Sequence, residues 1–206
     1  NNDVPFLSLL ALCISTLLLA AGGYSCNDVA DNETDRINKP QRVLPQNLYS
    51  LQQAKQFSIV LSVAGVLTGI ALAIHLKSLV LGLLFPGVAA LLLLYSGFLK
   101  RTPLIGNILV AALAALTILS VNWVTVAHLK EVYDGLIFET NIPGELNSII
   151  NFFALFAFLI NLIRELIKDA EDVEGDTCTG CRTLPVVAGF GKTRILLLTM
   201  ILITLV

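Results

Sequence analysis

The chain has 206 residues, of which 56% are hydrophobic and only 14% are charged, and its mean hydropathy is +0.82. The surface of a soluble domain of this length would need far more charge, so the composition excludes an ordinary soluble fold and indicates a membrane protein. The formal net charge of −2 and the pI near 5.6 give no reason to expect nucleic acid as a partner.

The apolar residues gather into runs of about 20, the length at which a helix rising 1.5 Å per residue crosses a hydrocarbon core of roughly 30 Å. The five full runs, in chain order, are Pro5–Cys26, Phe57–Leu76, Ser78–Phe98, Gly106–Leu129 and Leu146–Ile163. A sixth run, Ile195–Val206, ends with the chain. We therefore predict an all-α fold, a multi-pass transmembrane helical bundle of six spans, in one membrane-embedded domain over residues 1–206. Because the chain enters its first span almost at once and ends inside its last, we expect this domain to be incomplete at both ends.

The cations between the runs are divided unequally between the two membrane sides. One side has only Lys77 and Lys130. The other side has eleven, namely Arg36, Lys39, Arg42, Lys55, Lys100, Arg101, Arg164, Lys168, Arg182, Lys192 and Arg194. The positive-inside rule predicts that this second side is the cytoplasmic side of the cell membrane. The segments then expected in the cytoplasm are Asn27–Gln56, Phe98–Ile105 and Lys168–Val187.

Two clusters of aspartates share one spacing, D-x-x-D-x-x-x-D. The first cluster, Asp28, Asp31 and Asp35, follows the first run, and the second cluster, Asp169, Asp172 and Asp176, follows the fifth. Each aspartate of the second cluster lies 141 residues after its counterpart in the first. Both clusters follow spans that run from the outside to the inside, which indicates a parallel internal repeat.

The spacing i, i+3, i+7 places three side chains within about 60° of one helix face, at 100° per residue. We therefore expect each cluster to continue a membrane helix and both clusters to face a shared cavity. Asn27 lies beside the first stripe, and Asn161 and Glu165 extend the second stripe back into its span. Glu33 lies about 140° or more from the aspartates of its own cluster and should point away. A single acidic cluster after a span is usually a solvated helix end, but two copies with identical spacing are hard to explain in that way.

Six carboxylates brought together repel one another, by on the order of 4 kcal/mol for each pair at 4 Å with an effective dielectric constant near 20. Such an arrangement is reasonable if cations lie between the carboxylates. Ligands that are all oxygen, with no nearby His or Cys, favour Mg²⁺ or another hard ion, and Mg²⁺ usually leaves positions open for phosphate oxygens. Several cations are predicted on the same membrane side and could hold a diphosphate. These are Arg36, Arg42, Lys100, Arg101 and Lys168. For Asn107, Asn122 and Asn161, in or at the ends of spans, we expect hydrogen bonds to neighbouring helices.

The two clusters and their surroundings resemble the UbiA superfamily of intramembrane prenyltransferases. The family pattern NDxxDxxxD matches Asn27, Asp28, Asp31 and Asp35, and the second family motif matches Asp169, Asp172 and Asp176. Tyr95 and Lys100-Arg101 resemble the tyrosine–lysine loop of the family, with one residue more than the YxxxK of its quinone branch. The resemblance implies a nine-helix fold, of which this chain would cover helices two to seven.

The resemblance also implies a reaction. A prenyl diphosphate would ionise while Mg²⁺ ions between the two clusters neutralise the departing diphosphate, and an acceptor would take the prenyl group in an apolar channel. The residues expected to be catalytic are Asp28, Asp31, Asp169 and Asp172, with Asn27, Asp35 and Asp176 completing the metal ligands. Arg36, Arg42, Tyr95, Lys100, Arg101 and Lys168 are expected to bind the diphosphate. Within the superfamily the chain looks most like the geranylgeranylglycerol-phosphate geranylgeranyltransferases, which implies geranylgeranyl diphosphate as the donor and a lipid acceptor of membrane ether-lipid biosynthesis.

Other functions stay open on the sequence alone. An aromatic acceptor, of the hydroxybenzoate or homogentisate type used in quinone biosynthesis, would use the same metal motifs. A divalent-cation transporter would also need carboxylates, but near the middle of the membrane and not at one face. A CDP-alcohol phosphotransferase would have one continuous motif with DG and AR pairs, which neither cluster contains.

Overall fold

The computed structural model describes residues 4–38, 50–133 and 139–205, and within these ranges all regular structure is helical. The helices are α1 (Val4–Asn38), α2 (Leu51–His75), α3 (Leu79–Gly97), α4 (Ile105–Tyr133), α5 (Ile142–Glu171), α6 (Val173–Thr179), α7 (Leu184–Ala188) and α8 (Phe190–Leu205), with a short 3₁₀ turn, η2 (Leu99–Arg101), between α3 and α4. The predicted all-α fold is therefore confirmed.

Five of these helices, α1 to α5, are long and apolar enough to cross a membrane, which agrees with the five full apolar runs. The sixth predicted run lies in α8, whose 16 residues are fewer than the roughly 20 needed for a crossing. The described residues thus form a multi-pass helical bundle with five candidate spans and the shorter α8.

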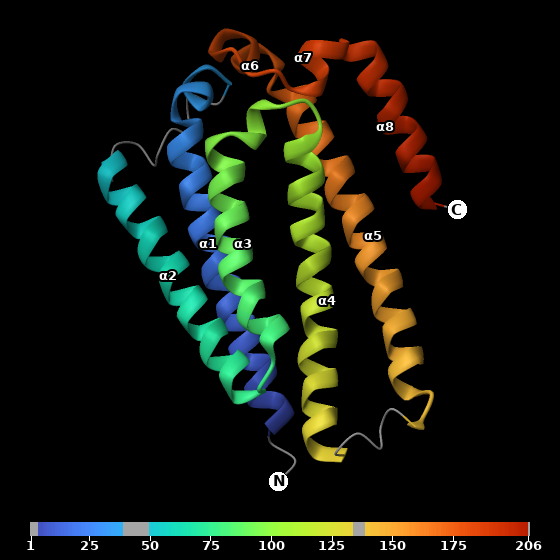
Figure 1. The fold of residues 1–206 in the computed structure, drawn as a ribbon. Helices are drawn as coiled ribbons and strands as arrows, with labels where there is room; N and C mark the ends of the chain where they lie inside the picture. The colour runs from blue at the N-terminus through green and yellow to red at the C-terminus, as the bar shows by residue number, and fades with distance from the viewer. Residues whose placement is uncertain (1–3, 39–49, 134–138, 206) are drawn as a thin grey trace.

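The long helices run alternately up and down the bundle, so the functional segments meet at one end (Figure 1). That end, which we call the motif end, is formed by residues 27–38, 98–107 and 169–194. The α2–α3 turn and the N-terminal part of α1 lie at the opposite end. Eight of the eleven cations predicted on the cytoplasmic side lie in these motif-end segments or in the last two turns of α5.

Small residues let α1 and α2 approach closely. Ser15 Oγ donates a hydrogen bond of 2.7 Å to the carbonyl oxygen of Gly65, and Ser58 Oγ donates one of 2.8 Å to that of Gly22. A Cβ atom added at Gly22 would lie 2.4 Å from Ser62 Oγ. Close backbone approach and hydrogen bonds of this kind hold helices together where water cannot drive their association.

A buried apolar core lies next to this contact and joins α1, α2, α3 and α4. Its fully buried side chains include Leu81 and Phe85 of α3 and Val124 of α4. The ring of Phe85 lies against Gly69 of α2, where an added Cβ atom would be 2.2 Å from the ring. This core fixes the position of α1, and therefore of the first aspartate cluster at its end.

Asparagines connect the helices of the other half of the bundle. Asn107, in the first turn of α4, donates a hydrogen bond of 2.8 Å to Oδ2 of Asp169 on α5, and Asn122 donates to Oδ1 of Asn147. The predicted interhelical bonds of Asn107 and Asn122 are thus confirmed. The prediction for Asn161 is wrong, because its Nδ2 donates to the carbonyl oxygen of Ala157 one turn earlier on the same helix.

Candidate active site

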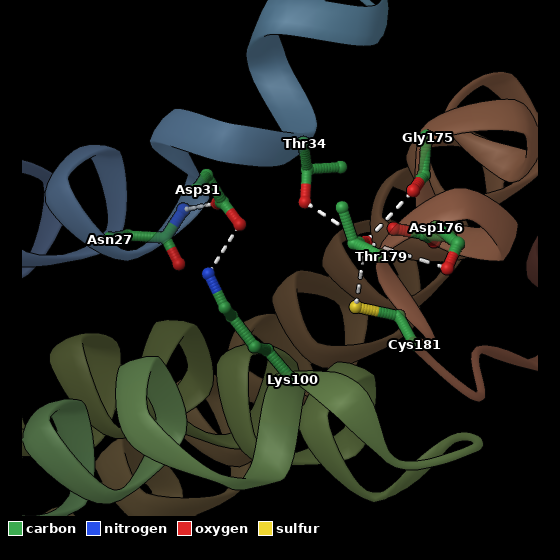
Figure 2. A network of polar contacts seen from close by, with 8 residues as sticks. All are labelled: Asn27, Asp31, Thr34, Lys100, Gly175, Asp176, Thr179 and Cys181. Atoms are coloured by element: carbon green, nitrogen blue, oxygen red, sulfur yellow. Dashed lines mark hydrogen bonds and ion pairs between the residues drawn. The ribbon is translucent and has the colours of Figure 1, made fainter.

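The first cluster lies on an unbroken helix, as predicted. Helix α1 continues past the apolar run to Asn38, so its aspartates project from one helix at the motif end. Asn27 Nδ2 donates a hydrogen bond of 2.6 Å to Oδ2 of Asp31, the residue four positions later (Figure 2). Asp31 and Asp35 are partly buried, whereas Asp28 and Glu33 are both exposed, so exposure does not distinguish Glu33 from the aspartates of the cluster.

The second cluster does not lie on one helix, and this prediction was wrong. Helix α5 ends at Glu171, Asp172 stands at the bend, and α6 begins at Val173. Asp169 is therefore on α5 and Asp176 on α6. The physical reason is that Gly175 weakens a continuous helix here, while the side chain of Asn38 on α1 binds the backbone of Asp172 and Gly175 on either side of the start of α6. The bend turns α6 toward the end of α1, and the two helices are in contact.

The bend brings the two clusters into electrostatic contact. Asp176 is buried, and its carboxylate Oδ2 accepts a hydrogen bond of 2.9 Å from Thr183 Oγ1. Burial raises the pKa of the Asp176 carboxyl above its ordinary value, and the charges of Asp172 and Asp31 raise it further, while Thr183 and Lys168 act in the opposite direction. The interaction of Asp176 with Asp31 connects the second cluster with the first, as a shared site requires.

Two of the predicted cations lie among the aspartates. Lys100 of η2 forms an ion pair with Oδ1 of Asp31, and its side chain is only 9% exposed (Figure 2). Lys168, on the last turn of α5, lies within electrostatic range of Asp28, Asp169 and Asp176. Lys168 can thus interact with both clusters.

The other predicted diphosphate cations are placed differently. Arg36 and Arg101 are both exposed. The backbone carbonyl of Arg101 accepts a hydrogen bond of 3.0 Å from the backbone N–H of Arg182, so this residue ties the α3–α4 turn to the segment after α6. Arg42 lies outside the described residues.

A cavity of about 240 Å³ opens between α1, α3, α4 and α5. The charged and amide-bearing side chains that line it, together with Tyr95, belong to the parts of the helices near the motif end; these are Asn27, Tyr95, Asn161, Arg164, Glu165 and Lys168. The hydroxyl-bearing residues Thr16, Thr117 and Ser120 line it farther from that end. Most of the remaining lining is apolar, with side chains such as Leu19, Phe85, Leu92 and Leu113. The cavity therefore has a polar end near the motif end and a largely apolar remainder, and Tyr95, Asn161 and Glu165 are among the residues that line it.

Two residues of this region were not among the predicted site residues. Arg164 lines the cavity and donates a hydrogen bond of 2.6 Å to Glu165 Oε1, and it precedes Lys168 by one helical turn. Asn107 holds the carboxylate of Asp169. The sequence pointed to Asn107 only as a polar residue at the start of an apolar run, on the same predicted membrane side as the clusters.

The donor atoms at the first cluster suit a hard divalent cation. Oδ1 of Asn27 is buried without a hydrogen-bond partner. Nδ2 of the same side chain donates to the carboxylate of Asp31, so the unpaired oxygen lies near that carboxylate. A buried carbonyl oxygen without a partner is costly, and a cation would satisfy it. Within the described ranges no three Asp, Glu, His or Cys residues lie close enough together to enclose a metal ion by themselves. The Asn27 carbonyl oxygen and the Asp31 carboxylate are oxygen donors of the kind that Mg²⁺ prefers, and Mg²⁺ commonly has only a few protein ligands and leaves positions for other oxygens.

Comparison with known proteins agrees with this geometry. All of the chain, residues 1–206, matches the model of the UbiA prenyltransferase family. The chain belongs to the UbiA prenyltransferase family. Its relatives include the digeranylgeranylglyceryl phosphate synthases of Methanoculleus marisnigri, 37% identical over 90% of this chain and 59% of the relative, and of Saccharolobus solfataricus, 37% identical over 97% of this chain and 66% of the relative.

A solved structure is also similar, from a study entitled "Structural and mechanistic insights into the biosynthesis of Digeranylgeranylglyceryl phosphate synthase in membranes". It is 27% identical to this chain with a TM-score of 0.56, and the match covers 97% of this chain and 62% of that one. The chain spans about six tenths of the length of these relatives. The family expected from the two aspartate motifs is confirmed.

Proposed function

We propose that the protein containing this chain transfers a geranylgeranyl group from geranylgeranyl diphosphate to geranylgeranylglycerol phosphate, with Mg²⁺, in membrane ether-lipid biosynthesis. The observation that carries the proposal is the approach of the two aspartate clusters to each other at the motif end, near the polar end of a largely apolar cavity, with Lys100 and Lys168 among the aspartates. Membership of the prenyltransferase family supports the reaction type, and the names of the relatives support the acceptor. We also propose that the motif end faces the cytoplasm.

The metal ligands would come from both clusters, with Asn27, Asp28 and Asp31 on α1 and Asp169, Asp172 and Asp176 on the other side. Asp35 would support the first set. Bound Mg²⁺ would neutralise the diphosphate that leaves the prenyl group.

The other groups of the site would act on the substrate directly. Lys168 can stabilise the negative charge that develops on the leaving diphosphate, because it already interacts with both clusters. Lys100 can do the same once the diphosphate competes for Lys100 and its cation competes for Asp31. The apolar wall of the cavity would hold the prenyl chain and keep water away from its reactive carbon.

The test is a product assay with the full-length protein in lipid nanodiscs, supplied with geranylgeranyl diphosphate and either geranylgeranylglycerol phosphate or an aromatic acceptor. We expect product with the glycerol phosphate and none with hydroxybenzoate or homogentisate. Product only with an aromatic acceptor would contradict the proposed acceptor, and ion flux in liposomes without any prenyl substrate would favour a transporter.

Variants of the clusters test the mechanism. Loss of a group that supports a metal ligand costs about 10–100-fold, so Asp31→Ala and Asp172→Ala, which remove proposed ligands, should each reduce turnover to near background. The double variant should be scarcely worse than either single variant, because groups that act as one unit are not additive. Glu33→Ala is the control and should keep most activity, since Glu33 lies about 140° or more around α1 from the aspartates of the first cluster. Turnover that survives EDTA, or a Glu33→Ala effect as large as that of Asp31→Ala, would show that the paired clusters do not act as proposed.

A further inference from the structure

The last residue of α1 contacts the backbone of the second cluster. Asn38 Oδ1 accepts a hydrogen bond of 2.8 Å from the N–H of Gly175, and Asn38 Nδ2 donates one of 3.1 Å to the carbonyl oxygen of Asp172. One side-chain amide thus binds the backbone both just before α6, at Asp172, and in its first turn, at Gly175. The helix that carries the first cluster therefore holds the backbone of the second.

These contacts take the place of a local helix cap. The first N–H groups of a helix have no partner within it, and an Asp at the N-cap position usually accepts from the third residue with its own carboxylate. Asp172 is at the N-cap of α6, but its side chain makes no capping hydrogen bond. The third residue of α6 is Gly175, and its N–H donates to Asn38 instead. Asn38 therefore supplies, from another helix, the acceptor that Asp172 would ordinarily supply.

Gly175 is fitted to Asn38 by its lack of a side chain. A Cβ atom added at Gly175 would lie 2.5 Å from Asn38 Nδ2, and its three nearest atoms would all belong to the Asn38 side chain. A glycine within a helix costs about 1 kcal/mol relative to alanine, so its presence here calls for a reason. The close approach of Asn38 provides one.

A second contact holds the other end of α6 to the same face of α1. Thr34 Oγ1 and Thr179 Oγ1 are hydrogen-bonded at 3.2 Å (Figure 2). Thr34 and Asn38 are four residues apart and continue the i, i+4 and i+3 spacing of Asn27 and Asp31, so all four lie along one stripe of α1. Asn27 and Asp31, in the earlier part of that stripe, belong to the first aspartate motif, and Thr34 and Asn38, in the later part, bind α6.

We propose that Asn38 is a positioning residue, which caps α6 in place of Asp172 and thereby sets the second cluster against the first. The Asp172 carboxylate is then not the cap of α6, and its charge acts on the carboxyl of Asp176. The inference rests on the proposed function, because it concerns the geometry of a metal site shared by the two clusters.

The first test measures metal binding directly, with Mn²⁺ as the probe and electron paramagnetic resonance of the full-length protein in nanodiscs as the readout. Asn38→Ala should weaken Mn²⁺ binding by about 10–100-fold, as expected when a group that orients a metal ligand is lost. Asn32→Ala is the matched control, because it removes the same residue type from the same helix, and its Mn²⁺ affinity should equal that of the parent. An Asn38→Ala protein that melts at a lower temperature but binds Mn²⁺ like the parent would overturn the inference, since Asn38 would then be merely structural.

The second test is a double-variant cycle. Gly175→Ala should weaken Mn²⁺ binding more than Asn38→Ala does, because its methyl group collides with Asn38. In the presence of Asn38→Ala the collision disappears, so the double variant should bind no worse than Asn38→Ala alone. Effects that simply add would mean that the two residues do not act through their contact. If Gly175→Ala alone fails to fold, recovery of folding in the double variant supports the contact and continued failure contradicts it.

Variants of the proposed ligands separate this inference from the proposed function. A parent protein that binds no Mn²⁺, or Asp31→Ala and Asp172→Ala proteins that bind it like the parent, would contradict the proposed metal site, and the role of Asn38 would fall with it. Loss of binding in both aspartate variants together with normal binding in Asn38→Ala would contradict only the positioning role of Asn38.

Discussion

Replacement of Asn107 by alanine should weaken the site without touching any of its proposed ligands. Asn107 is 6% exposed, and its Nδ2 lies 2.8 Å from Oδ2 of Asp169. A hydrogen bond to a charged group contributes about 1.5–3 kcal/mol, and each 1.4 kcal/mol corresponds to a factor of ten. Without Asn107, Oδ2 of Asp169 loses its hydrogen-bond partner and the carboxylate is no longer held in its orientation. We therefore expect kcat/KM to fall by about 10–150-fold. The Mg²⁺ concentration that gives the half-maximal rate should rise.

The assay measures the initial rate of the full-length protein in nanodiscs against Mg²⁺ concentration, together with the melting temperature. Asn122→Ala is the matched control, because Asn122 is equally buried on the same helix but bonds to Asn147, away from the motif end. Both variants should melt at lower temperature than the parent, and only Asn107→Ala should change the Mg²⁺ dependence. The same Mg²⁺ dependence in both variants would refute the reasoning, since Asn107 would then contribute to stability alone.

Three further predictions concern charge, packing and topology. Burial raises the pKa of the Asp176 carboxyl in the folded state, so the folded state loses stability as the pH rises through that pKa. Asp176→Asn removes this titration, so the variant should melt at a higher temperature than the parent at pH 7. The difference in melting temperature should shrink toward pH 3.8, the ordinary pKa of the carboxyl. A lower melting temperature at both pH values would contradict that account. Gly69→Ala should cost about 1–3 kcal/mol by overpacking against Phe85, whereas Gly82→Ala, whose Cβ would have ordinary contact only with Ala73, should be neutral or stabilising. The exposed thiol of Cys178 should react with an impermeant maleimide only after the membrane is permeabilised, and labelling from outside intact cells would invert the proposed topology.

Properties that depend on one helix at a time could be predicted from the sequence. The spans follow from run length, and the face shared by Asn27 and Asp31 follows from their separation of four positions on a continuous helix. The repeated spacing of the two clusters indicated that they act together, and Asp176 does lie within electrostatic range of Asp31. Periodicity carries this information because the geometry of a helix is the same wherever it occurs.

Properties that depend on contacts between helices could not be predicted in this way. The pairing of Lys100 with Asp31 depends on the α3–α4 turn, where Leu104 has a positive φ of 68° and Gly106 lies so close to the turn that a Cβ atom would be 2.8 Å from the carbonyl oxygen of Leu99. Neither the φ angle of a leucine nor the partner of a lysine is visible in a hydrophobic pattern. The same holds for the bond from Asn107 to Asp169, which joins residues 62 positions apart.

The two clusters share one sequence pattern but are held in different ways, and this difference has consequences for mutation. The first cluster is positioned by the continuity of α1, so a side chain on that helix keeps its direction as long as the helix is intact. The second crosses the bend at Asp172 and is positioned by side chains from other segments: Asn107 holds Asp169, Thr183 holds Asp176, and Asn38 holds the backbone between them. Sites that support the second cluster are therefore scattered over α1, α4 and the start of α7. Variants that impair catalysis without altering a ligand should concentrate at these scattered positions, because no single helix can preserve the geometry of the second cluster by itself.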